Sequence, residues 1–168
     1  MARKNVKTIV RRPKVNWSHE TTGISLTIPS EKTNGLYQAG SVVVTPSSVQ
    51  GVRTVGNWTI TVPVSSSAAT AQILSATQIY WALVFVPQGT SANALFSTTG
   101  DLSGSLYEPN QFVLASGIAD PDAGPLRIRS RIMRKLQSND QISLILGSTA
   151  IGTSVQGRAL VSYSIKYN

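Results

Sequence analysis

Apolar and polar residues alternate along most of this chain with a period of two. Residues 24–28, for example, have the sequence ISLTI and stop at Pro29. Successive side chains of a strand point to opposite faces, so such a run buries one face and leaves the other in water. Strand patterns of this size recur at residues 42–45, 52–64, 78–87, 111–118, 126–133, 141–146 and 158–167. The sequence therefore predicts about eight strands and almost no helix.

A chain of 168 residues with this many short strands suits one all-β domain. Loops rich in Gly, Pro, Ser and Asn separate the strands, which is typical of a sandwich, a jelly roll or a barrel. Residues 78–87 are apolar on both faces and therefore predict a central strand. Two packed antiparallel sheets fit this pattern, with a basic arm at residues 1–20 and the β domain at 21–168. The strand pattern alone leaves the three architectures open.

Charge is scarce, since only 13% of residues are charged, about half the usual share. Ser and Thr fill the polar positions instead. A surface with so little charge has weak protection against self-association, so other copies of the chain are expected to cover part of it. The alternative is a monomer with a Ser/Thr-rich surface.

The positive charge is concentrated at the N-terminus. Six of the 15 Lys and Arg residues lie in the first fourteen positions, and no acidic residue precedes Glu20. They are Arg3, Lys4, Lys7, Arg11, Arg12 and Lys14. Such an arm attracts polyanions by releasing their condensed counterions. The run RRPK at residues 11–14 also matches a nuclear import signal, a pattern that many basic tails share.

A second basic group is an arginine row formed by Arg127, Arg129 and Arg131. On a strand these side chains project from one face, while Leu126, Ile128 and Ile132 project largely from the other. The row predicts a phosphate-binding surface or a set of partners for carboxylates of another subunit. A solvated outer face with satisfied ion pairs is the alternative. Trp17 is a candidate for stacking on unpaired bases, whereas Trp58, on an alternating run, is expected in the core.

Signals for catalysis and for bound metals are weak. His19 is the only histidine and adjoins the arm, where a general base would be poorly oriented. No cysteine is present, and Asp120 and Asp122 lie in a DPDAGP segment that turn chemistry explains, with a calcium site as a weaker alternative. We therefore predict no enzyme activity, no cofactor and no metal site. No apolar run has the length of a membrane span, so no membrane partner is predicted.

Two loops are longer than ordinary connections. Residues 65–77 are rich in Ser, Ala and Thr, which predicts an exposed, mobile loop. Residues 88–110 contain several large apolar residues, including Phe96 and Tyr107. A loop of this length usually serves a function or covers a surface. It is expected to form a subunit contact or to pack on its own domain.

Six segments of the chain resemble capsid proteins of small circular single-stranded DNA viruses that encode a replication initiator, such as circoviruses and nanoviruses. The segments are VQGVRTV (49–55), IYWALVFVPQGT (79–90), LYEPNQFV (106–113), DAGPLRI (122–128), LQSND (136–140) and YSIKY (163–167). They occur in the expected order and span most of residues 36–168.

The resemblance implies a single eight-stranded jelly roll of the viral capsid type. It further implies a shell of sixty copies enclosing a single-stranded DNA genome, with a disordered basic arm inside. The protein would then belong to the virion, although no host receptor can be identified from the sequence. The arm is shorter and poorer in Arg than those of circoviruses, so the arginine row becomes a natural supplement. A coat protein of a small RNA or satellite virus, or a β-sandwich that binds nucleic acid without forming a shell, remains an alternative.

Overall fold

The computed structural model describes residues 16–29, 31–32, 36–47, 51–65, 74–75, 78–92, 112–148 and 155–167. Within these ranges nearly every element is a strand, and the helix content is one short 3-10 turn, η1 (Pro121–Ala123). In the described part of the chain, no helix is long and apolar enough to span a membrane. The observed elements therefore agree with the all-β prediction.

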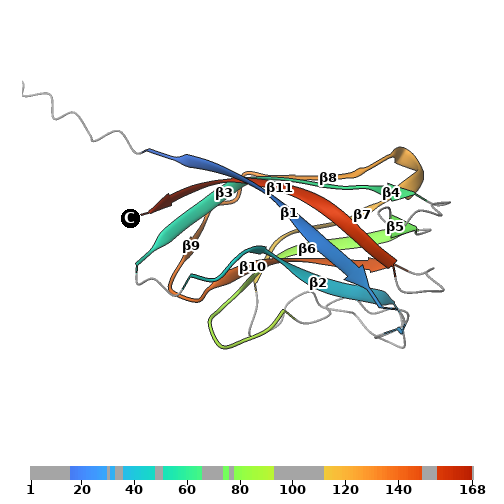
Figure 1. The fold of residues 1–168 in the computed structure, drawn as a ribbon, viewed down its shortest axis with the longest axis horizontal. Coiled ribbons are helices and arrows are strands. Elements are labelled where there is room, and N and C mark those ends of the chain that lie inside the picture. The colour runs from blue at the N-terminus through green and yellow to red at the C-terminus, as the bar shows by residue number, and fades with distance from the viewer. Residues whose placement is uncertain are drawn as a thin grey trace, which may run out of the picture.

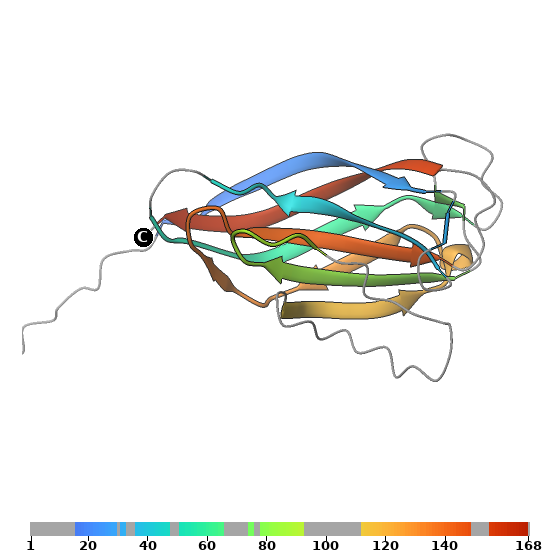
Figure 2. The same cartoon turned by 90° about the horizontal axis from the view of Figure 1, so that it is seen from below.

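Two antiparallel sheets lie one over the other (Figure 1, Figure 2). The first sheet has the order β1 (Ser18–Ile28), β11 (Val155–Tyr167), β3 (Arg53–Val62) and β8 (Leu126–Ser130), and β9 (Arg134–Leu136) also pairs with β3. The second sheet has the order β2 (Tyr37–Val44), β10 (Gln141–Ser148), β6 (Ile79–Val86) and β7 (Phe112–Ala119). A short parallel pair, β4 (Val64–Ser65) with β5 (Leu74–Ser75), forms a separate two-stranded ladder.

The strand order is that of a jelly roll. With β8 and β9 taken as one interrupted strand, the main strands pair first with last, second with second-last, and so on inward: β1 with β11, β2 with β10, β3 with β8 and β6 with β7. A long hairpin rolled into two sheets produces this pairing. The prediction of an antiparallel jelly-roll sandwich is confirmed, and the choice between sandwich, jelly roll and barrel is settled by the pairing.

The main core lies between the sheets and follows the predicted alternation. Leu26 and Ile28 of β1 are buried, and Trp58 of β3 is only 1% exposed, as expected. Strand β6 is buried on both faces, because Leu83 belongs to the main core and Val84 to a second apolar cluster on the opposite side of the sheet. Since β6 pairs with β10 on one side and β7 on the other, the predicted central strand is confirmed.

Strand β1 begins earlier than the alternation predicted. It starts at Ser18, opposite Ile165 of β11, although residues 18–23 are polar or small and largely exposed. Main-chain pairing with β11 forms this part of the strand, so side-chain periodicity gives no sign of it. The boundary near residue 20 between arm and domain remains a prediction, because residues 1–15 lie outside the described part of the chain.

The prediction of one strand through residues 126–133 is wrong. Strand β8 ends at Ser130, and β9 begins at Arg134. Ile132, expected on the buried face, is 46% exposed in the link between them, and its carbonyl accepts a hydrogen bond from Trp58 Nε1 at 3.0 Å. Gly56 leaves room for this link, since a Cβ there would lie 2.5 Å from Met133 Cγ and 3.2 Å from the Ile132 oxygen.

The two long loops are only partly described. Of residues 65–77, Ser65 and the two residues of β5 are described, and of residues 88–110, only 88–92. The predicted mobility of the first loop and the covering role of the second therefore fall on residues outside the described ranges.

Candidate nucleic-acid interface

Strand β8 places two arginines on the outward face of the first sheet. Arg129 lies opposite Thr59 of β3, while its neighbour Ile128 is buried in the core. Arg127 and Leu126 repeat this arrangement two residues earlier. The predicted alternation therefore holds along β8, where backbone pairing with β3 fixes which face each side chain takes.

Neighbouring strands add further cations to the same face. On β11, Arg158 precedes the buried Ala159, and Lys166 follows the buried Ile165. Because side chains alternate along a strand, Arg158 and Lys166 both project outward. Lys135 of β9 and Lys166 flank Thr54 of β3 in the pairing register. Together with the exposed Arg131 in the β8–β9 link, these residues form what we call the cationic face: Arg127, Arg129, Arg131, Lys135, Arg158 and Lys166.

The cations elsewhere in the domain have intramolecular partners. Lys32 lies over the ring of Tyr37, and Arg53 donates to two main-chain carbonyls. The Arg134 guanidinium lies 4.3 Å from the ring centre of Phe85. On the cationic face, by contrast, only Lys166 has such a contact within the described residues, over the Trp17 ring at 5.4 Å. For the other five side chains, the described residues provide no contact of this kind, so their hydrogen-bond donors can serve a ligand.

Acidic residues are absent from this face in the described part of the chain. The described acidic residues are Glu20, Glu31, Asp120, Asp122 and Asp140. Glu20 lies opposite Tyr163 and accepts a hydrogen bond from its hydroxyl at 2.8 Å. The others lie between β1 and β2, at the η1 turn, or buried beside β10. Within the described part of the chain, no carboxylate compensates the positive charge of the cationic face, and such a field attracts polyanions.

A bulge in β3 shapes the middle of the cationic face. The register between β3 and β11 shifts so that Asn57 and Trp58 together oppose Tyr163. Asn57 has a φ of +54°, a left-handed conformation that Asn tolerates better than most residues. The bulge turns Asn57 outward, while Trp58 packs inward with its ring centre 5.3 Å from that of Tyr163.

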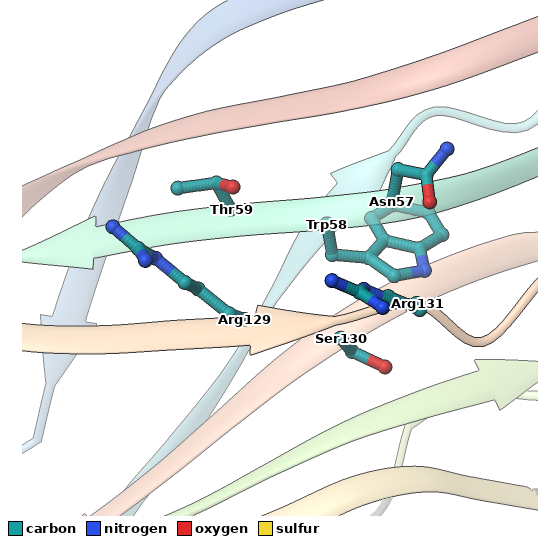
Figure 3. Close-up of a pocket in the computed structure, with 6 residues that line it drawn as sticks. All are labelled: Asn57, Trp58, Thr59, Arg129, Ser130 and Arg131. Carbon is teal, nitrogen blue, oxygen red and sulfur yellow. The ribbon is translucent and has the colours of Figure 1, made fainter.

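Beside the bulge lies an open hollow of about 360 Å³. Its lining comes from two adjacent strands and the link that follows β8: Asn57, Trp58, Thr59, Arg129, Ser130 and Arg131 (Figure 3). Figure 3 shows the Arg129 side chain reaching from β8 toward Thr59. The lining thus combines two guanidinium groups with the Asn57 amide and the Thr59 hydroxyl, and it contains no carboxylate. The Ser130 hydroxyl points away from these groups and accepts a hydrogen bond from the Ile132 amide at 3.3 Å.

The arm joins the sheet at the same end as part of the cationic face. The arm cations, from Arg3 to Lys14, lie outside the described residues. Trp17 is 40% exposed just before β1, and the Lys166 ammonium lies over its ring. This contact shows that Trp17 has a partner on β11, whereas its proposed stacking on bases stays a prediction.

The remaining candidate residues have structural surroundings. His19 is an exposed residue of β1 and lies opposite Ser164 of β11. Asp120 caps η1 by accepting a hydrogen bond from the Asp122 amide at 2.9 Å, and Gly124 has a φ of +95°, as the turn pattern predicted. Among the described residues, no group of three potential metal ligands comes together.

Sequence reasoning missed Arg158 and Lys166 as companions of Arg127 and Arg129. Both alternate with apolar residues in 158–167, which indicates exposure. However, the alternation does not say that β11 lies on the same sheet as β8. Asn57 was also missed, because only the strand register reveals the bulge.

The sequence matches no protein-family model and no curated protein sequence. One solved structure similar to this chain is that of infectious bursal disease virus, Gx strain, with 10% sequence identity and a TM-score of 0.34. The alignment covers 95% of this chain and 35% of the viral chain. The fold assignment made above rests on strand order and pairing.

Proposed function

We propose that this protein is a capsid subunit that assembles into an icosahedral shell around a circular single-stranded DNA genome. The observation that carries the proposal is the segregation of charge on a jelly-roll domain. Six of the nine Lys and Arg residues outside the arm (15 minus six) lie on one sheet face that contains no described acidic residue. Such a face attracts polyanions and raises their concentration near the protein.

In this function the cationic face and the basic arm point toward the packaged strand. Both bind phosphates without sequence preference, so their affinity falls as salt rises. With sixty copies the arms alone would supply about 360 positive charges, and the cationic face doubles that to about 720. The face would therefore neutralise as many phosphates of the genome as the arm does. It would supply positive charge that the short arm lacks.

Subunit contacts would come from the charge-poor remainder of the surface. Contacts between different patches of neighbouring copies generate closed shells when the rotation between subunits closes. Exposed apolar side chains available for such contacts include Ile118 of β7 and Val42 of β2, both on the second sheet. The protein would act in the virion as a structural component, without catalysis or cofactor, and the RRPK run would serve nuclear import.

Electron microscopy of the purified full chain tests the proposal. Shells that contain nucleic acid are expected, and deletion of residues 1–15 should lower the nucleic-acid content while the domain stays folded. Sensitivity of the extracted nucleic acid to DNase rather than RNase would distinguish a DNA capsid from an RNA virus coat protein. A species of only a few subunits at every salt concentration and pH would refute the capsid function and favour a non-capsid nucleic-acid-binding sandwich.

A further inference from the structure

The hollow beside the β3 bulge brings two arginines of the cationic face together with Asn57. We propose that it binds one nucleotide unit of a single-stranded nucleic acid, with the phosphate between Arg129 and Arg131 and the base at Asn57. The inference rests on the proposed function, because the packaged genome is the single-stranded nucleic acid that would supply this nucleotide.

The phosphate position follows from the two arginines. Arg129 and Arg131 both line the hollow, and neither side chain has a hydrogen-bond or ion-pair partner among the described residues. A guanidinium group offers donors in a planar fork that matches two phosphate oxygens. No carboxylate lines the hollow to compete for these donors. A phosphate there would satisfy donors for which the described part of the chain provides no partner.

The base position follows from the bulge. Asn57 projects outward there, and its amide offers both donors and an acceptor, as a base edge requires. Thr59, two residues along β3, adds a hydroxyl-bearing side chain to the same exposed face. The Trp58 ring is only 1% exposed and its Nε1 already donates to the Ile132 carbonyl, so it is not available as a stacking platform. Recognition would therefore use hydrogen bonds to the base edge.

The size of the hollow limits the ligand. Its volume of about 360 Å³ is near the lower end of the range of about 300–1,000 Å³ for small-molecule sites. A single nucleotide is the natural occupant. The Watson–Crick edges of bases are accessible in an unpaired strand, whereas base pairing occupies them in a duplex, so the site should prefer single strands.

Binding of a fluorescent oligothymidylate to the full chain tests the site. Arg131→Gln and Arg129→Gln should each weaken binding roughly tenfold, the loss expected for one charge-assisted contact to phosphate. Arg127→Gln is the matched control, because it removes the same charge from the same strand face outside the hollow, and about a twofold loss is expected from the general field. Equal losses for all three variants would overturn the site.

A second variant separates hydrogen bonding from charge. Asn57→Gly keeps the left-handed backbone accessible and removes the amide. It should weaken oligothymidylate binding about threefold, with an unchanged dependence of affinity on salt, whereas Arg131→Gln should reduce the salt slope by roughly one. Unchanged affinity in Asn57→Gly would refute the base position.

Further binding measurements test the nucleotide site separately from the proposed capsid function. Stronger binding of thymidine monophosphate than of inorganic phosphate supports a nucleotide site, and equal binding refutes the base contact. If oligouridylate and oligothymidylate bind with equal affinity, the site accepts single-stranded RNA as well as DNA. If the protein binds neither oligonucleotide, the proposed site is overturned. Electron microscopy of the same variants reports on shells independently, so shell formation without discrimination by the hollow would refute this inference alone.

Discussion

Arg53 contacts Asp140 through the main-chain carbonyl of that residue rather than through its carboxylate. The guanidinium donates to the Asp140 oxygen at 3.3 Å and to the Thr45 oxygen at 3.1 Å. The Asp140 carboxylate accepts instead from the amides of Gln137, at 2.7 Å, and Gln88, at 3.1 Å. These contacts tie the ends of strands from both sheets together at one end of the sandwich.

Asp140→Asn should destabilise the domain by about 1–3 kcal/mol. The asparagine amide would present a donor to one of the two main-chain amides that the carboxylate now satisfies, in a site where the residue is only 8% exposed. Urea denaturation followed by tryptophan fluorescence measures the change. Glu31→Gln makes the same chemical change at an exposed position and should leave the midpoint nearly unchanged. An equal shift in both variants would show that the amide contacts contribute nothing.

Gly117→Ala should destabilise the domain by about 1–3 kcal/mol through overpacking. Gly117 lies opposite Trp81, and an added Cβ would lie 2.8 Å from the indole Cζ2. Thermal unfolding measures the loss, and Trp81→Phe in the same background should recover part of it. Gly23→Ala is the control, since nothing lies within 4 Å of its added Cβ. If both alanine variants unfold at the same temperature, the close contact with Trp81 has no energetic weight.

Tyr163 should make stability fall at alkaline pH. Burial, followed by the hydrogen bond to Glu20, raises the pKa of the Tyr163 hydroxyl well above its usual range. Below pH 10 the phenol is protonated in both states and this contribution is fully present. Above pH 10 the unfolded state loses a proton that the folded state retains, so the free energy of unfolding declines as pH rises.

Tyr163→Phe should therefore flatten the decline above pH 10, at a cost of about 1 kcal/mol at neutral pH for the lost hydrogen bond. Melting temperatures between pH 8 and pH 11 measure both effects. Tyr167→Phe, at a residue that is 71% exposed, should keep the wild-type slope. A parallel decline in the wild-type protein and Tyr163→Phe would assign the alkaline loss to other groups.

Replacement of Arg127, Arg158 and Lys166 by Gln should lower the nucleic-acid content of purified particles without unfolding the domain. Arg127 and Arg158 are exposed, and the triple variant removes half of the cationic face. The ratio of absorbance at 260 and 280 nm measures the content. Lys32→Gln, a cation outside this face, should have little effect. Unchanged content in the triple variant would exclude the face from packaging.

Periodicity predicted the strands because a strand between water and a core must alternate. Residues 24–28 and 78–87 show this most clearly, and both were assigned to the right kind of strand. It failed at residues 18–23 and 131–133. In the first segment main-chain pairing with β11 forms the strand without apolar side chains, and in the second the link beside Gly56 interrupts the run.

By itself, the sequence determined the all-β class, the exposure of Arg127 and Arg129, the core position of Trp58 and the concentration of charge in the first fourteen residues. Each of these depends on residue type and local spacing. Only the tertiary structure decided that Arg158, Lys166 and Lys135 join the arginines on one face, and that Asn57 turns outward beside Arg131. Those relationships depend on which strands pair and in what register, and hydrogen bonds between distant segments set both.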